Sequence, residues 1–155
     1  PKGLPCQWKQ EGYVRKYFVI FEDPDGQPAS NPDALEVISL AASGPPGGLP
    51  EEAIADPGIF IGDPPTQHNH VYFQDPTGQM TVGMWSSTPF EMAATPFPRN
   101  EFMHLLEGAV TLTDGEGVEH HFKAGDTVYV PKGAVLGWKN TQDVRKFYVM
   151  FEPSE

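Results

Sequence analysis

The stretch GDTVYVPKG at residues 125–133 decides the fold class. It joins a Gly-Asp turn to four residues rich in β-branched and aromatic side chains, and it ends in a Pro-x-Gly turn. A second stretch, EFMHLLEG at residues 101–108, continues into AVTLTDG at residues 109–115. Short apolar runs bounded by glycine turns are typical of strands, so both stretches predict an all-β domain.

Outward from these stretches, further short apolar segments follow at a regular spacing. Turns with the sequences Asp-Pro-Thr-Gly (75–78), Asp-Gly-Glu-Gly (114–117) and Ala-Gly-Asp (124–126) separate them. The series predicts eight strands, at 70–73, 79–85, 102–106, 109–113, 118–122, 127–130, 135–139 and 144–151. Eight strands at this spacing indicate a β-sandwich or a closed jelly-roll barrel. Before the series we expect a short strand at 35–41 and one short helical turn near 50–55.

The two opening stretches resemble the two sequence motifs of the cupin family. Residues 101–108 match the first motif from its glutamate onward, and residues 125–133 match the second, in which five residues separate a Gly from Pro-x-Gly. The run Gly83-Met84-Trp85 and the run Val144-Arg145-Lys146 narrow the resemblance to the branch with the ethanolamine-utilisation cupins and (S)-ureidoglycine aminohydrolase. The resemblance implies a double-stranded β-helix (jelly-roll) barrel.

The N-terminus repeats the last part of the chain. Residues 1–22 align without a gap on residues 131–152, and 11 of the 22 positions are identical. We therefore predict that residues 1–24 are the last two strands of a preceding cupin module, that 25–34 is a linker, and that 35–155 is the cupin domain. On this interpretation the chain is the C-terminal part of a two-cupin protein.

The repeated segment is rich in aromatic and β-branched residues, which are costly to leave in water. Unpaired strands of this kind recruit another strand. We expect the segment to add to a sheet edge of its own barrel or of a second copy, which would give a homodimer.

Charge and composition exclude several classes of partner. The formal net charge is −11, with 10 Lys and Arg against 21 Asp and Glu, so we expect binding neither to nucleic acid nor to an anionic membrane. No apolar run approaches the roughly 18 residues of a membrane span. The single cysteine, Cys6, cannot form an internal disulfide, which favours a cytoplasmic protein.

Metal-binding members of the resembled family carry a His-x-His pair before the first-motif glutamate and a further His after the second motif. At the corresponding positions this chain has Thr95, Phe97 and Leu136, and only Glu101 remains. One carboxylate does not hold a divalent transition metal, which needs three or four ligands. We therefore expect no metal and no other cofactor. The alternative is a cluster of Glu101 with His68 and His70, whose spacing places both imidazoles on one face of a strand.

Alternation along the strands predicts a pocket inside the barrel. In the cupin register Glu101 and Met103 share the inward face of one strand. Leu136, Trp138 and Asn140 share the inward face of the strand that follows the second motif. The predicted pocket consists of Glu101, Phe97, Met103, Leu136, Trp138 and Asn140. A buried Glu101 needs a partner. It is stabilised either as a protonated acid that donates to Asn140 or a water, or as a carboxylate paired with a cationic ligand, for which Trp138 offers a cation–π face.

These observations leave three hypotheses for function. The first is a metal-free cupin that binds a small polar metabolite, of the amine or amino-acid-like class, in its barrel. The second is a metal-dependent cupin enzyme that acts on a small nitrogenous metabolite. The third is a structural or dimerising module. No nucleophile–base pair or phosphate-binding loop in the sequence supports a specific reaction.

Overall fold

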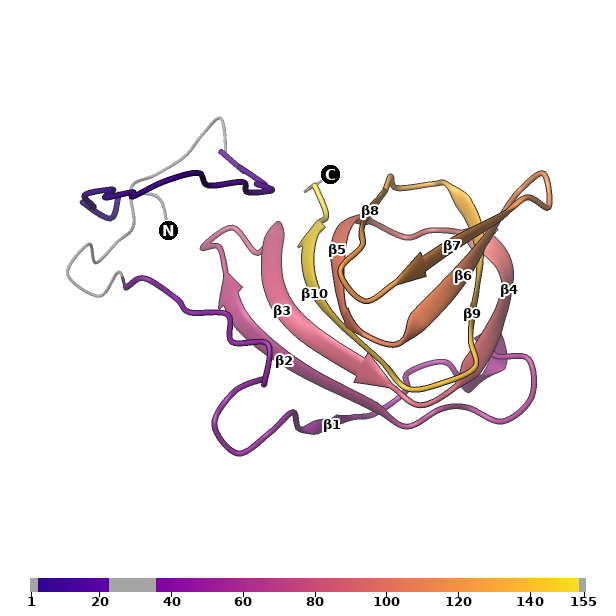
Figure 1. Ribbon diagram of the computed structural model, residues 1–155. Coiled ribbons are helices and arrows are strands. Elements are labelled where there is room, and N and C mark those ends of the chain that lie inside the picture. Colours follow the sequence, from indigo (N-terminus) through magenta and orange to yellow (C-terminus); the bar gives the residue numbers. More distant parts are fainter. Residues whose placement is uncertain (1–2, 23–35, 154–155) are drawn as a thin grey trace.

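The computed structural model describes residues 3–22 and 36–153, and nearly all of its regular structure is strand (Figure 1). The strands are β1 (Glu51–Glu52), β2 (Gln67–Gln74), β3 (Met80–Ser87), β4 (Phe90–Pro96), β5 (Asn100–Glu107), β6 (Ala109–Asp114), β7 (Glu119–Lys123), β8 (Thr127–Val130), β9 (Val135–Asn140) and β10 (Val144–Phe151). One 3-10 turn, η2 (Pro57–Ile59), lies between β1 and β2. No helix in the described ranges has the length and hydropathy that crossing a membrane requires.

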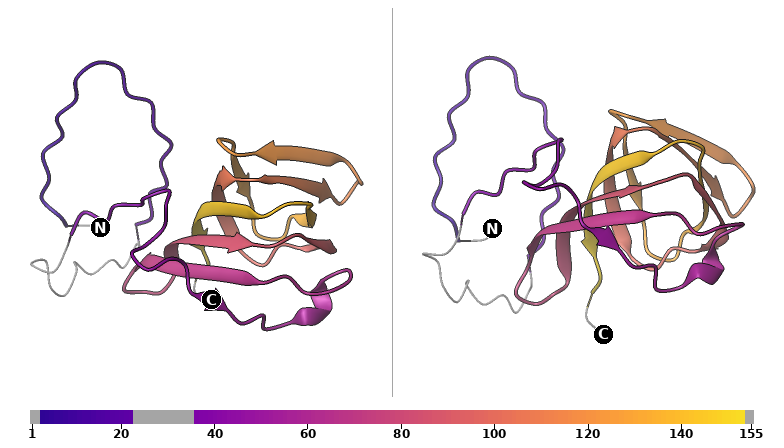
Figure 2. Two further views of the ribbon diagram at one scale, coloured as in Figure 1. Left: turned by 60° about the horizontal axis from the view of Figure 1, so that its bottom comes forward. Right: turned by 90° about the horizontal axis from the view of Figure 1, so that it is seen from below.

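The strands form two antiparallel sheets that curl around a common interior (Figures 1 and 2). One sheet has the order β1-β2-β3-β10-β5-β8, and the other has the order β4-β9-β6-β7. The chain crosses from one sheet to the other between β9 and β10, as it also does between β5 and β6. This is the predicted jelly-roll barrel.

Strict alternation along the inner strands builds the core. On β5, Glu101, Met103 and Leu105 are buried, while the residues between them are only partly covered. Inward side chains of both sheets meet in one apolar cluster. Its buried members are Met103, Leu105, Val110, Leu112, Val130, Trp138 and Val144.

All eight strands of the predicted series are present, and two of them, β8 and β10, have the predicted bounds. β4 was not predicted, because its sequence FEMAATP is poor in β-branched residues and ends in proline. Such a strand is tolerated because β4 lies at the edge of its sheet, where a missing N–H removes no ladder hydrogen bond.

The predictions before the barrel were wrong in two places. Residues 36–41, the described part of the expected strand at 35–41, form no strand. Near residues 50–55 there is no helical turn, because Glu51 and Glu52 pair with β2 as a short edge strand. The helical signal lies a few residues later, where the Asp56 carboxylate accepts a hydrogen bond from the Gly58 N–H at 2.9 Å and caps η2.

The described part of the repeated segment, residues 3–22, forms an extended arch beside the barrel (Figure 2). It contains no strand and no β-ladder with an edge of this barrel. This result is contrary to the first of the two arrangements that we expected. Pairing with another copy stays a prediction. The predicted linker at 25–34 and its boundaries lie outside the described residues, so the division of the chain at residues 24 and 34 stays a prediction as well.

Candidate functional site

A buried ion pair lies inside the barrel, between neighbouring strands of the larger sheet. Glu101 is on β5, and Lys146 is on β10. Their Nζ–Oε1 distance is 2.7 Å, and each side chain is less than one tenth exposed. Along β10 it is Met150 that stands opposite Glu101, so the long lysine side chain reaches along the barrel to meet the carboxylate.

Two tryptophans enclose the ammonium group of Lys146. Its Nζ lies 4.9 Å from the ring centroid of Trp85 and 5.0 Å from that of Trp138, and it also donates to the Met103 sulfur at 3.0 Å. The two indole rings meet edge to face, with centroids 6.0 Å apart. Each ring face is attractive to a cation, and the carboxylate neutralises the charge. The ammonium group of Lys146 is therefore enclosed by a carboxylate, a thioether sulfur and two indole rings.

The inward position of Lys146 follows from the alternation of β10. Val144, Lys146 and Tyr148 are all buried on one face, while their neighbours point the other way. The Tyr148 ring lies across Gly83 on β3, where an added Cβ would come within 2.2 Å of the ring. Glycine is therefore the residue that lets this tyrosine lie flat inside the barrel.

Tyr148 reaches past β3 to β2, where its hydroxyl group donates to the Asn69 side-chain oxygen at 2.9 Å. The Asn69 amide in turn donates to the Glu52 carboxylate on β1 at 3.0 Å. Burial raises the pKa of the Tyr148 hydroxyl above its ordinary value of 10.0. The group is therefore a neutral donor over the whole physiological range.

Two adjoining cavities open around the ion pair. The larger has a volume of about 570 Å³ and is lined mainly by aromatic and aliphatic side chains. The smaller, of about 250 Å³, is mainly polar and contains Glu101 and Tyr148. Five residues line both cavities: Glu52, Gln67, Trp85, Arg99 and Lys146. Polar groups thus gather at the junction, and the apolar wall surrounds the larger space.

Arg99 is the second cation of the site, and its guanidinium group has no carboxylate within ion-pair distance among the described residues. Its Nε is buried and makes no hydrogen bond, and one terminal nitrogen donates to the Met150 sulfur at 3.0 Å. No Asp or Glu in residues 3–22 or 36–153 forms an ion pair with it. The other arginine of the barrel, Arg145, also has a buried Nε without a hydrogen bond, but it differs because a terminal nitrogen pairs with Glu107 at 3.0 Å.

The structure brings together most of the predicted pocket. Phe97, Met103, Leu136 and Trp138 line the larger cavity, and Glu101 lines the smaller one. Asn140 is buried but lines neither. It accepts a hydrogen bond from the Trp138 indole at 3.0 Å, and its amide donates to the carbonyl oxygens of Thr88 and Gln142. Asn140 therefore orients Trp138 and does not contact Glu101.

The residues at the expected metal positions do not fit a divalent transition metal. Thr95, Phe97 and Leu136 lie together on the wall of the larger cavity and provide no imidazole. The carboxylate of Glu101 is engaged by Lys146. A cation already stands beside the only carboxylate of the set, and the usual ligand number is not reached.

The alternative cluster with two histidines is not brought together either. Gln67 and Asn69 of β2 line the smaller cavity. Because side chains alternate along a strand, His68 and His70 point to the opposite face of β2. The His70 ring packs against Tyr72, with ring centroids 4.6 Å apart. In the ranges 3–22 and 36–153, no three His, Cys, Asp or Glu side chains are grouped closely enough to hold a metal ion.

The sequence-based interpretation missed Lys146, Arg99 and Trp85. Lys146 lies in a Val-Arg-Lys run that resembles an exposed strand end, and Arg99 lies two residues before the first motif. One signal was available for the lysine. Alternation from the buried positions Val144 and Tyr148 places residue 146 on the inward face.

Sequence comparison supports the resemblance on which the fold was predicted. Residues 74–148 match the family described as the EutQ-like cupin domain. No curated protein matches the chain. The match covers β3 to most of β10, which is the part of the chain that contains Glu101, Arg99 and Lys146.

Solved structures with the same fold include a DUF861-family protein of unknown function from Pseudomonas syringae pv. tomato. It is 36% identical, with a TM-score of 0.63, over 66% of this chain and 43% of that one. The chain therefore spans less than half the length of that protein. The EutQ protein of Clostridium difficile (15% identity, TM-score 0.51, 62% and 73% covered) and the polyketide cyclase RemF of Streptomyces resistomycificus (16%, 0.52, 66% and 73%) share the fold alone.

Proposed function

Because the chain belongs to the cupin superfamily, with similarity to its EutQ-like branch, we propose that the barrel binds a small polar metabolite that carries a carboxylate. The observation that carries the proposal is Arg99, a partly buried guanidinium that lines both cavities and forms no ion pair with any residue in 3–22 or 36–153. A planar guanidinium binds a carboxylate through two parallel hydrogen bonds, and this geometry favours arginine wherever carboxylates are recognised.

The arrangement changes the expected role of Glu101. We expected a cationic ligand to pair with Glu101, but the ammonium group of Lys146 pairs with it and lies between Trp85 and Trp138. The cation–π position that a simple amine would need is therefore occupied by Lys146. An amino-acid-like ligand fits better, since its carboxylate would face Arg99 and its ammonium group would face Glu52 at the junction of the cavities.

The same ion pair supports binding without a metal. In the family pattern Glu101 is the acidic ligand, and here Lys146 supplies the positive charge beside it. The aromatic wall of the larger cavity, with Trp85, Phe90 and Trp138, gives the carbon skeleton of the ligand an apolar surface. The proposal is for a binding protein, and it assigns no reaction.

The test is a thermal-shift screen of matched compounds. Carboxylates, amino acids and amines with the same carbon skeletons are added to the wild-type protein, to Arg99→Gln and to Arg145→Gln. Arg145 is the matched control, because its guanidinium is already paired with Glu107. We expect carboxylates to raise the midpoint of the wild type and of Arg145→Gln but not of Arg99→Gln. Stabilisation by amines alone, no stabilisation by any carboxylate, or an equal effect on Arg99→Gln would overturn the proposal.

A further inference from the structure

The N-terminal arch, residues 3–22, exposes side chains whose counterparts in the repeat are buried. Trp8 is 67% exposed, whereas Trp138 is 7% exposed, and Phe18 is 71% exposed, whereas its counterpart Tyr148 is 3% exposed. The difference arises from the surroundings, because the sequences are alike. In the barrel these positions point into the core, and in the arch both side chains remain mostly exposed. The arch thus exposes the side chains that β9 and β10 turn into the barrel.

The arch also repeats the ammonium site. Lys16 corresponds to Lys146, and its Nζ lies 5.0 Å from the ring centroid of Trp8. The Nζ of Lys146 lies at the same distance, 5.0 Å, from Trp138. The pair of lysine and tryptophan is therefore formed twice, from the same two positions of the repeat. One copy is enclosed in a barrel, and the other lies at the surface.

The open form of the arch agrees with the place of its counterparts in the fold. β9 and β10 belong to different sheets, so they pair with other strands and not with each other. The two arms of the arch likewise do not pair, and they enclose an open loop in the view of Figure 2. Each arm therefore lacks the neighbours that a barrel would supply, which are equivalents of β4 and β6 on one side and of β3 and β5 on the other.

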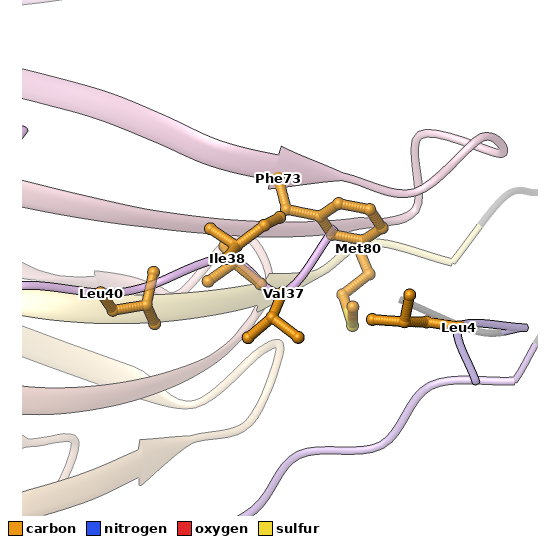
Figure 3. A pocket seen from close by; sticks show the side chains of 7 residues that line it. Leu4, Val37, Ile38, Leu40, Phe73 and Met80 are labelled. Carbon is orange, nitrogen blue, oxygen red and sulfur yellow. The ribbon is translucent and has the colours of Figure 1, made fainter. Parts of the chain in front are cut away.

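This chain's own barrel covers only a small part of the arch. Leu4 lies in an apolar groove of about 340 Å³ with Val37, Ile38 and Met80 (Figure 3). At the other end the Phe21 ring packs on Phe151, with centroids 5.1 Å apart. These contacts leave the inward face of the arch, with Trp8 and Phe18, open to solvent.

We propose that the arch completes a second cupin barrel that lacks strands equivalent to β9 and β10, and that Lys16, held against Trp8, is the buried ammonium group of that barrel. The partner that would cover the exposed face of the arch is thus a cupin barrel built from two sheets like those of this chain. Covering Trp8, Val14 and Phe18 would remove a large apolar surface from water, which is the driving force for the association. Resting on the proposed function, the second pocket would take the same class of carboxylate-bearing ligand.

The test is whether the arch sequence can form β9 and β10 in this chain's own barrel. In the grafted chain, a second copy of residues 1–22 replaces residues 131–152. We expect the grafted chain to unfold cooperatively in urea. Substituting methionine for the lysine of the graft should shift the urea midpoint as far as Lys146→Met shifts it in the parent chain. The matched control is Lys16→Met in the parent, where the arch is exposed, and it should leave the midpoint unchanged.

One position could stop the graft from folding for a local reason. The graft places glutamine at Gly137, where an added Cβ would lie 3.1 Å from the Met92 carbonyl oxygen. A second graft therefore keeps glycine there. Failure of both grafts to fold, or a graft in which the lysine substitution shifts the midpoint no more than Lys16→Met does, overturns the proposal. The readout is stability alone, so it does not depend on whether the barrel binds a carboxylate.

Discussion

Lys146 and Glu101 form a salt bridge of 2.7 Å inside a barrel whose other inward residues are mostly apolar. Removing two charges from water is expensive, and the mutual attraction offsets this cost only while both partners are present. The pair therefore contributes little to stability as a whole, but each member depends strongly on the other.

Replacing Lys146 with methionine should lower the free energy of unfolding by about 3–5 kcal/mol, because it leaves a buried carboxylate without a partner. The double variant Lys146→Met with Glu101→Gln should recover much of this loss. Urea unfolding of the wild type, both single variants and the double variant measures the effect.

Lys139→Met is the control, since Lys139 pairs with Glu91 at 2.8 Å on the surface, where both side chains are about half exposed. A pair of this kind, with both partners in water, contributes little to stability. If Lys146→Met were as mild as Lys139→Met, the ion pair would not be buried in solution as the structure has it.

Gly83→Ala should destabilise the barrel by about 1–3 kcal/mol, because the new methyl group would collide with the Tyr148 ring at 2.2 Å. The same substitution made in a Tyr148→Ala background should cost much less. In a Tyr148→Phe background the full cost should remain, since the ring is still present. A cycle of urea unfolding measurements gives the coupling, and equal costs in the three backgrounds would contradict the predicted collision.

Asp75 should make the turn between β2 and β3 sensitive to acid. Partial burial opposes the charged carboxylate, but hydrogen bonds from Thr77 and from the Met80 N–H at 2.6 Å outweigh it and hold the pKa of Asp75 below its ordinary value of 3.8. A lowered folded-state pKa means that the contribution is present above the unfolded value and is lost as the pH falls through the folded one.

At neutral pH, Asp75→Asn should therefore cost about 1 kcal/mol, the typical size of a lost hydrogen bond. The difference in unfolding free energy between wild type and variant should narrow as the pH falls below about 4. A series of urea titrations between pH 7 and pH 3 checks this expectation. A difference that stays constant over the series would count against it.

The barrel could be predicted from the sequence because its strands carry local signals, namely alternation and glycine turns, that neighbouring strands reinforce. The strand β4 carries neither, and its pairing with β9 depends on the rest of the fold. The site was harder to predict. Alternation places Trp138 and Met103 on the inward face. The contact of Lys146 with Glu101 joins residues 45 positions apart, which no local pattern indicates. Arg99 stands out only because its buried Nε has no hydrogen-bond partner among the described residues.

The hydroxyl group of Tyr148 should give the barrel a measurable loss of stability in alkali. Its hydrogen bond to Asn69, which in turn binds Glu52, connects β10 through β2 to the edge strand β1. Tyr148→Phe should cost about 1 kcal/mol at neutral pH while keeping the ring over Gly83.

Burial raises the pKa of Tyr148, so the neutral hydroxyl is favoured in the folded state. The stability that the hydroxyl contributes is present below the unfolded-state pKa of about 10 and is lost as the pH rises through the folded-state pKa. Wild-type protein should thus lose more stability than Tyr148→Phe between pH 9 and pH 11, as followed by urea unfolding at each pH. Because other tyrosines and lysines ionise in both proteins, the comparison depends on the difference between them. A parallel decline of the two would mean that the Tyr148 hydroxyl is exposed to water and does not hold Asn69.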